Sequence, residues 1–210
     1  MTYRHEIKTL SDVCGIQSGF TARSALVEDG LRGIPALQMG DLRSDFEVPL
    51  AAASRYKLEG RLDRYAVGAG DVLFRSRGDK NTAMVVVGDT DEEAVALLPL
   101  IILRANKDLV LPDFLAWLIN QPEAQRYLDS CARGTKLRMI PRDCLDKMPV
   151  SIPDLVTQKL VVEVSRLAAK EAGLLRELAA KKEEFTSFAL LRQVRNAQLH
   201  GNEAGHKVAR

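Results

Sequence analysis

A long amphipathic helix after Pro153 is the feature that most constrains how this chain of 210 residues can fold. Its apolar residues alternate in steps of four and three, and only Glu171 and Lys181 interrupt the series. The series consists of Leu160, Val164, Leu167, Leu174, Leu178, Phe185 and Phe188. This spacing is typical of the seam of a coiled coil. A helix over residues 152–185 is about 50 Å long at 1.5 Å per residue, which is more than a globular domain of this size can cover.

The seam requires a second helix, because an apolar stripe that stays in water is unfavourable. No other segment of the sequence predicts a helix of similar length, so we expect the partner to come from a second subunit. We therefore predict a homodimer whose interface contains Leu160, Val164, Leu167, Leu174, Leu178 and Phe185. The Lys and Arg residues around the seam are nearly balanced by Glu, which is typical of a solvated outer face.

The sequence before the helix predicts strands, turns and two short helices. Short apolar or β-branched runs separated by Gly, Asp and Asn occur at residues 33–42, 63–78, 82–89 and 94–106. They predict a curved, mainly antiparallel sheet. Pro112 and Pro122 each mark the start of a short helix, the second of which is expected to run to Gly134.

These elements together predict an α+β fold. We expect a sheet domain with short helices over residues 1–152 and a long coiled-coil-type helix over residues 153–191. Residues 192–210 are rich in Asn, Gln, His, Gly and charge, and are expected to form a disordered polar tail. Gln158, near the start of the helix, either packs or caps locally or takes part in the joint between helix and sheet domain.

Composition narrows the class of protein. The chain is 46% hydrophobic and 28% charged, and it contains neither the apolar core of a signal peptide nor a run of the roughly 20 apolar residues that span a membrane. We therefore expect a soluble, cytoplasmic protein. Cys14, Cys131 and Cys144 are an odd number of cysteines without close spacing, so we expect them to be reduced and structural.

No catalytic motif is recognisable. The glycines of "VGAGD" at 67–71 are followed by the apolar run "VLF" where a nucleotide-binding fold would open a helix, so this stretch predicts a β-turn before a strand. The three histidines lie near the two ends of the sequence, and no metal-binding His pair or phosphate-binding loop is present. We predict a protein that is not an enzyme and that uses no cofactor or metal.

One short stretch is strongly basic although the net charge of the chain is only +2. Residues 133–142, "RGTKLRMIPR", contain four basic residues and no acidic one. On charge alone, this stretch fits a solvated turn and an edge that contacts phosphates equally well. The second interpretation is possible because Lys and Arg neutralise the backbone charge of nucleic acids. The glycine would allow such a backbone to approach closely.

Five segments in order resemble one known family. They are "LSDVCGIQSGFT" at 10–21, "GIPALQMGDL" at 33–42, "VGAGDVLFRSRGD" at 67–79, "LPDFLAWLINQPEAQRYLDSCARGT" at 111–135 and "MPVSIPDLVTQKLVVEV" at 148–164. Together they resemble the specificity (S) subunits of type I restriction–modification systems. The resemblance implies a target-recognition domain that reads one half of a split DNA sequence. It also implies a long helix that binds a companion helix and methyltransferase subunits.

The length of the chain differs from that family pattern. A typical S subunit carries two recognition domains and two long helices, whereas this chain has room for one of each. The resemblance therefore implies a half-subunit, and a homodimer would restore the pair. Such a dimer would direct a methyltransferase, and a nuclease where the system has one, to a split and palindromic site.

The resemblance also implies double-stranded DNA as a partner, with phosphate contacts that fix position and base contacts that specify sequence. The candidates lie in the polar turn after "DVLF" and around Gly134, although each charged one could instead be solvated. They are Arg75, Arg77, Lys80, Asn81, Arg133, Gly134, Thr135, Lys136 and Arg138.

Two other functions remain open from the sequence. The chain could be a coiled-coil scaffold whose globular part binds protein, in which case binding to random DNA and its dependence on salt would be absent. It could also be the recognition fragment of a methyltransferase enzyme, in which case it would bind S-adenosylmethionine.

Overall fold

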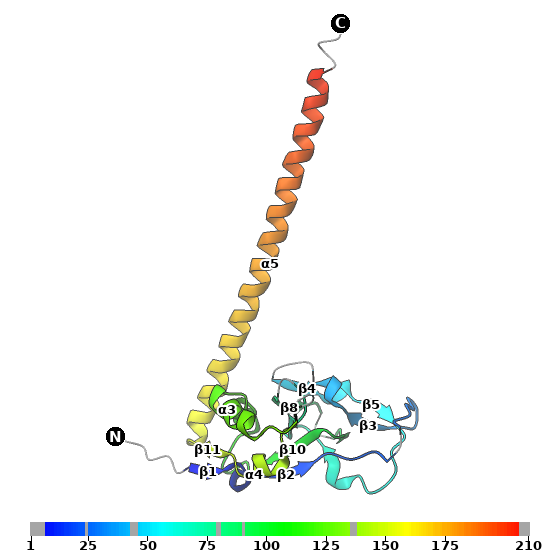
Figure 1. Cartoon of the computed structure of the whole chain (residues 1–210), viewed down its shortest axis with the longest axis vertical. Coiled ribbons are helices and arrows are strands. Elements are labelled where there is room, and N and C mark those ends of the chain that lie inside the picture. The colour runs from blue at the N-terminus through cyan, green and yellow to red at the C-terminus, as the bar shows by residue number, and fades with distance from the viewer. Residues whose placement is uncertain are drawn as a thin grey trace, which may run out of the picture. The chain divides into compact units, whose positions relative to one another are not determined.

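The computed structural model describes residues 7–23, 25–42, 46–78, 81–89, 91–134 and 138–205, with side chains as far as Arg195. The chain divides into two compact units, residues 1–162 and residues 163–210. The predicted fold class is confirmed, because sheets and short helices are followed by one continuous helix (Figure 1).

The strands form three sheets. A five-stranded sheet has the order β2 (Cys14–Ser18), β10 (Leu100–Ala105), β7 (Val72–Arg75), β8 (Ala83–Val87) and β4 (Glu47–Pro49). A four-stranded sheet has the order β5 (Ser54–Tyr56), β3 (Ile34–Leu37), β9 (Ala94–Ala96) and β6 (Ala66–Val67). The last sheet pairs β1 (Ile7–Thr9) with β11 (Pro149–Ser151). Among these described strands only β3–β9 and β4–β8 pair in parallel, so the predicted antiparallel character is confirmed.

The five-stranded sheet is buried on both faces. Val72 and Phe74 of β7 belong to the same buried cluster as residues of the short helices, whereas Leu73 belongs to a cluster on the opposite face. Strand β10 alternates in the same way between Ile101 and Ile102. Successive side chains of a strand point to opposite faces, so a strand covered on both sides is apolar at nearly every position. This explains the uninterrupted runs "VLF" and "LIIL".

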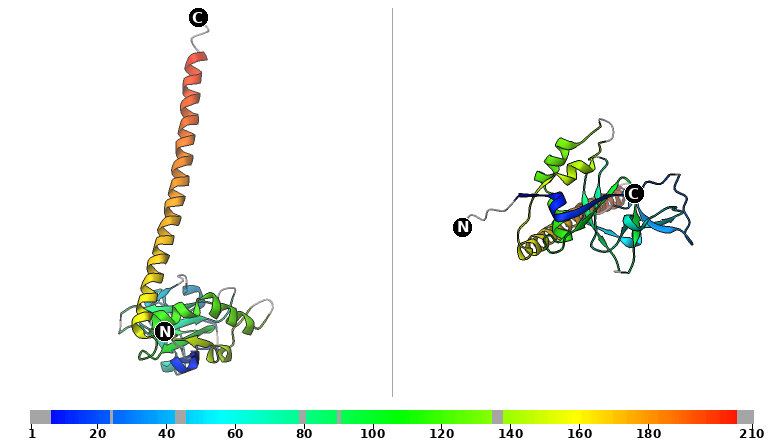
Figure 2. Two further views of the ribbon diagram at one scale, coloured as in Figure 1. Left: turned by 90° about the vertical axis from the view of Figure 1, so that its left-hand side faces the viewer. Right: turned by 90° about the horizontal axis from the view of Figure 1, so that it is seen from below.

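The short helices gather at one end of the first unit, and the four-stranded sheet lies at the other (Figures 1 and 2). Proline occupies the first turn of α2 (Pro112–Ile119) and of α3 (Pro122–Cys131), as predicted. The other two are α1 (Leu10–Val13) and α4 (Arg142–Asp146), and short 3-10 turns cover 39–41, 50–52 and 63–65. Helix α3 ends at Cys131 and not at Gly134, because Ala132 is already extended.

The stretch "VGAGD" is a β-turn before a strand, as predicted. The Asp71 amide donates to the Gly68 carbonyl at 3.1 Å, and the Gly68 amide donates to Asp71 Oδ2 at 3.1 Å. Gly70 has a φ of +91°, which favours glycine. The turn leads directly into β7.

The three cysteines carry free thiols, in agreement with the prediction. Cys14 and Cys144 are buried, and burial is the main cause that raises the pKa of each to about 12. Both thiols are therefore protonated and unreactive at neutral pH.

Helix α5 (Leu155–Gly205) begins at an acidic cap. Asp154 Oδ1 accepts hydrogen bonds from the amides of Val156 and Thr157, each at 3.0 Å. The Thr157 hydroxyl donates to Asp154 Oδ2 at 2.7 Å and lowers the pKa of that carboxyl group. No helix in the described part of the chain is both long enough and apolar enough to cross a membrane.

Helix α5 also ends later than predicted. It continues through 192–205, where we expected a polar tail, because Arg, Gln, Ala and Leu in this stretch are good helix formers despite its polar composition. The remainder of the predicted tail, residues 206–210, lies outside the described residues.

Gln158 anchors the start of α5. Its fully buried side chain accepts a hydrogen bond from the Leu111 amide at 2.8 Å and donates to the carbonyls of Leu109 at 2.9 Å and Pro153 at 2.7 Å. Val161 and Val162 pack against the same core. Gln158 therefore both bonds locally, to Pro153, and takes part in the joint between the helix and the sheet domain. The first unit extends to residue 162, beyond the predicted boundary at 152.

Replacement of Gln158 by Leu should destabilise the first unit. It leaves the Leu111 amide and two carbonyls without their partner, which costs about 3 kcal/mol. Chemical denaturation followed by the fluorescence of Trp117, the sole tryptophan, measures this change. Lys159→Ala on the exposed neighbour is the control and should change stability by less than about 0.5 kcal/mol. Equal stability of the Gln158→Leu variant and the wild type would contradict the anchoring role.

Candidate nucleic-acid interface

Two basic segments that are far apart in the sequence lie side by side. Arg77 forms a β-bridge with Met139, and the Gly78 amide donates to the Arg138 carbonyl at 3.1 Å. The Ile140 amide donates to the Ser76 carbonyl at 2.8 Å. We call residues 75–78, 133–134 and 138–140 together the basic turns. The structure thus brings the predicted contact residues Arg75 and Arg77 next to Arg133 and Arg138.

The second basic turn closes on itself. Arg133 and Met139 exchange two backbone hydrogen bonds of 3.0 Å, and Gly134 has a φ of +91° where the chain turns away. Three predicted contact residues, Lys80, Thr135 and Lys136, lie outside the described residues.

A framework of side-chain amides supports the basic turns from beneath. Asn81 Nδ2 donates to the Arg75 carbonyl at 3.0 Å, and Gln125 Nε2 donates to the Asn81 carbonyl at 2.9 Å. Asn120, at the end of α2, accepts from the Ala83 amide and donates to the Ala83 carbonyl, both at 2.8 Å. These bonds join the turn after β7 to α2 and α3.

Asn81 must therefore be corrected as a candidate DNA contact. Its side chain is only 4% exposed and its amide group is used by the Arg75 carbonyl. The sequence could not show this, because a polar residue in a Gly-containing turn is usually exposed. Asn81 positions the turn that carries Arg75 and Arg77.

The charges of the basic turns are partly balanced. Arg133 lies 3.6 Å from Asp143, and Arg138 forms an ion pair with Asp129. The adjoining Arg142 lies 3.7 Å from Asp146. These pairs are largely exposed, so each contributes little to stability and its arginine can exchange partners.

Arg75 and Arg77 are different. Neither has a carboxylate partner among the residues that the structure describes; Arg75 Nε donates to the Arg77 carbonyl at 3.3 Å, and Arg77 Nη2 lies 3.8 Å from Met139 Sδ. Arg77 is exposed and Arg75 is half-buried. They are thus the cations of this surface that are most available to an anionic ligand.

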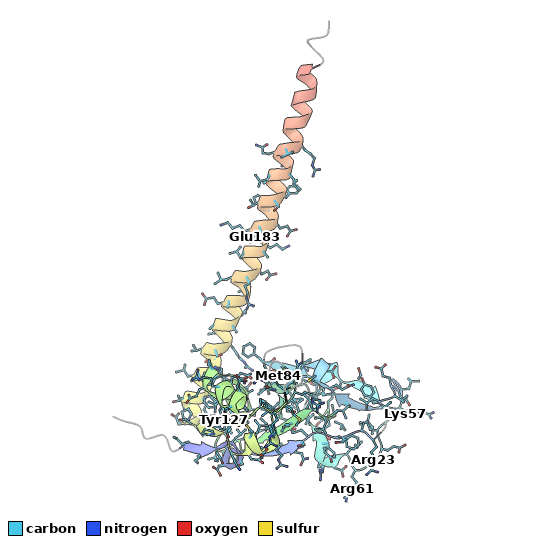
Figure 3. All side chains as sticks on the ribbon, in the orientation of Figure 1. Arg23, Lys57, Arg61, Met84, Tyr127 and Glu183 are labelled. Carbon is cyan, nitrogen blue, oxygen red and sulfur yellow. The ribbon has the colours of Figure 1, made fainter. Side chains whose placement is uncertain are left out.

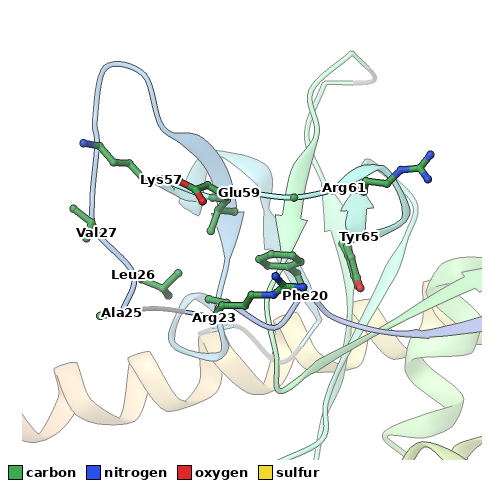
Figure 4. Close-up of a pocket in the computed structure, with 12 residues that line it drawn as sticks. Phe20, Arg23, Ala25, Leu26, Val27, Lys57, Glu59, Arg61 and Tyr65 are labelled. Atoms are coloured by element: carbon green, nitrogen blue, oxygen red, sulfur yellow. The ribbon is translucent and has the colours of Figure 1, made fainter.

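A second cationic surface was missed by the sequence analysis. A cleft of about 630 Å³ at the end of the first unit that carries the four-stranded sheet is lined by Arg23, Lys57 and Arg61 together with Phe20 and Tyr65 (Figures 3 and 4). The two rings meet edge to face with centroids 5.2 Å apart. Lys57 and Arg61 are four residues apart in the sequence, whereas Arg23 is distant and only the fold brings it to the same cleft.

The predicted dimer interface lies exposed on α5. Leu160, Val164, Leu167, Leu174, Leu178 and Phe185 are between 56% and 71% exposed in the single chain. Leu160 lies two residues beyond the buried Gln158, which places it about 200° around the helix. Leu160 is therefore not on the face of α5 that Gln158 attaches to the core.

Three solved structures resemble the chain. The first is a chain from a type I R-M system studied for its assembly and conformational transition, with a TM-score of 0.64, 18% identity and coverage of 87% of this chain and 43% of that one. The second is the HsdS subunit of Thermoanaerobacter tengcongensis, with a TM-score of 0.60, 20% identity and coverage of 84% and 40%. The third is the type I S subunit of M. genitalium, with a TM-score of 0.50, 10% identity and coverage of 81% and 41%.

The chain has the S-subunit fold. This confirms the predicted resemblance. The chain spans less than half the length of each S-subunit structure that it matches. No protein-family model and no curated protein matches the sequence.

Replacement of Asn120 by Ala should weaken the framework under the basic turns. It leaves the amide and the carbonyl of Ala83 unpaired, which costs about 2 kcal/mol. The Ala83 amide should also exchange its hydrogen faster, as measured by exchange and mass spectrometry. Gln121→Ala is the control, since Gln121 bonds only within its own helix region, to the Trp117 carbonyl. Unchanged protection of Ala83 in Asn120→Ala would contradict the assignment.

Proposed function

We propose that the chain is the DNA-recognition subunit of a type I-like restriction–modification system. The observation that carries the proposal is the S-subunit fold, matched over 87% of this chain but only 43% of the longer one. One sheet unit and one long helix correspond to half of a subunit that needs two of each. The role is recognition without catalysis, and the chain would act in the cytoplasm with no cofactor of its own.

The proposed active form is a homodimer joined through α5. The exposed seam supports it, because an apolar stripe of this length in water favours association. Two identical recognition units related by a two-fold axis would read a split, palindromic site. The dimer would direct methyltransferase subunits, and a nuclease where the system has one, to that site.

The proposed DNA contacts lie on the basic turns. Arg75 and Arg77 are available for phosphates or base edges, and Arg133 and Arg138 can exchange their exposed carboxylate partners for phosphates. Gly134 would permit close approach of the DNA backbone. Lys80, Thr135 and Lys136 flank these residues in the sequence and remain part of the proposal.

Replacement of Arg77 and Arg133 by Ala should weaken binding to all duplex sequences. Loss of two phosphate contacts should reduce the slope of log affinity against log salt by up to about two units. Fluorescence anisotropy with random duplex DNA at several salt concentrations measures the slope.

Two further variants make this experiment decisive. Arg176→Ala on α5 removes a charge outside the basic turns and should leave the slope unchanged. Arg23→Ala with Arg61→Ala removes two charges from the cleft. A reduced slope in the cleft variant alone would move the DNA contact to the cleft, and no salt-dependent binding by the wild type would reject DNA recognition.

Replacement of Leu167 and Leu174 by Asp should dissociate the dimer. Each change places an unpaired carboxylate in the apolar interface. The two changes together should cost about 3 kcal/mol or more of association free energy. Analytical ultracentrifugation at micromolar concentration measures the mass. Lys159→Gln with Glu183→Gln, on exposed positions of α5 outside the seam and its flanking residues, is the control and should remain dimeric. A monomeric wild type would refute the homodimer.

A further inference from the structure

Two charged residues interrupt the apolar seam of α5. Glu171 and Lys181 occupy seam positions, and both are exposed in the single chain. We propose that they fix the orientation and the register of the second copy. The two helices run antiparallel, with Glu171 of each copy opposite Lys181 of the other. This inference rests on the homodimer proposed above and adds to it the residues that select one pairing.

The seam is self-complementary from Val164 to Phe188 in this arrangement. The two-fold axis lies beside Arg176, midway between Glu171 and Lys181. Each layer then joins a residue of one copy that precedes Arg176 to a residue of the other copy that follows Arg176 by the same number of positions, as in antiparallel coiled coils. The apolar layers are Leu174 with Leu178, Leu167 with Phe185, and Val164 with Phe188 of the second copy.

Other arrangements do not pair the two charges. A parallel dimer in register places Glu171 opposite Glu171 and Lys181 opposite Lys181. An antiparallel dimer shifted by one heptad places Lys181 opposite Val164 or Leu178, and Glu171 opposite Leu174 or Phe188. A charge facing an apolar side chain loses water without gaining a partner. A polar residue in a seam specifies register for this reason.

The flanking residues support the same register. Lys170 lies just before a seam position and would face Glu184 of the second copy, twice in the dimer. Glu177 would face Glu177 of the second copy once, at the two-fold axis. The two attractive Lys170–Glu184 pairs therefore outnumber this single repulsive pair. Within one chain Lys181 already lies 3.0 Å from Glu184, with both side chains 72% exposed. An exposed pair of this kind is weak and does not prevent Lys181 from meeting Glu171.

Single charge changes distinguish antiparallel from parallel helices. In the antiparallel dimer, Glu171→Lys or Lys181→Glu converts two attractive contacts into two repulsive ones, and the dissociation constant should rise about tenfold or more. The double variant restores both contacts and should return to within about threefold of the wild type. A parallel dimer keeps the same number of like-charge contacts in every variant. Unchanged dissociation constants for both single variants in sedimentation equilibrium would overturn the proposal.

Disulfide cross-linking tests the register itself. Chains carrying Val164→Cys and chains carrying Phe188→Cys should cross-link to each other when mixed, and neither should cross-link to itself. The wild type, with its three native cysteines, is the control. Cross-linking of Val164→Cys chains to themselves would show a parallel pair and overturn the register while the homodimer stands. A wild-type monomer in sedimentation would instead remove the homodimer and the register together.

The charged pair also sets the distance between the two recognition units. A second copy of residues 173–179 inserted after Ala179 keeps the seam and separates Glu171 from Lys181 by one more heptad. Spin labels on Lys159→Cys of the two copies should then lie about 10 Å further apart. A second copy of residues 182–188 inserted after Phe188 leaves the charged pair unchanged, and the label distance should not change. Equal distances in the two insertion variants would overturn the proposal.

The same insertions have a consequence for the DNA site. An increase of about 10 Å corresponds to about three base pairs at 3.4 Å each. Insertions of four residues, in contrast, move the seam around the helix and should weaken the dimer.

Discussion

The burial of the five-stranded sheet on both faces is the constraint on which the rest of the first unit depends. Strands β7 and β10 send alternate side chains into two clusters, so each face must be covered by another layer. The short helices cover one face, and residues of the four-stranded sheet and its neighbouring turns cover the other. The turns that leave the ends of the strands are then held in defined positions by these layers.

The basic turns illustrate how a polar surface is held on an apolar framework. Asn81, Asn120 and Gln125 use their amide groups on backbone atoms of the turn and of β8, so the backbone that carries Arg75 and Arg77 is fixed from below. A fixed backbone reduces the entropy lost when arginines bind an anion. The exposed ion pairs of Arg133 and Arg138 leave those arginines able to bind an anion, because exposed pairs are weak.

Helix α5 uses different faces for packing on the core and for its apolar seam. Gln158, Val161 and Val162 attach its first turns to the core through one face, and the seam that starts at Leu160 lies on another. The core of the first unit therefore leaves Leu160 exposed. In the proposed homodimer, the charges at Glu171 and Lys181 would weaken most pairings of the seam and favour one, which exchanges some affinity for a defined arrangement.

Local patterns in the sequence were enough to predict the periodic elements and the turns. The heptad spacing predicted the long helix, Pro112 and Pro122 predicted two helix starts, and "VGAGD" predicted a turn, because each depends on the local chain. The end of α5 was predicted too early, because polar composition does not prevent a helix whose residues have high helix propensity. The ordered motifs also sufficed for the S-subunit resemblance, which the fold confirms.

Which residues share a surface could be seen only in the fold. It divided the strands among three sheets and joined the turn after β7 to the turn before α4, because strand pairing between distant segments is not encoded in local spacing. It buried Asn81 and gathered Arg23, Lys57 and Arg61 around one cleft. Burial and long-range hydrogen bonding depend on what the fold places next to a residue, whereas periodicity depends only on the residue's neighbours along the chain.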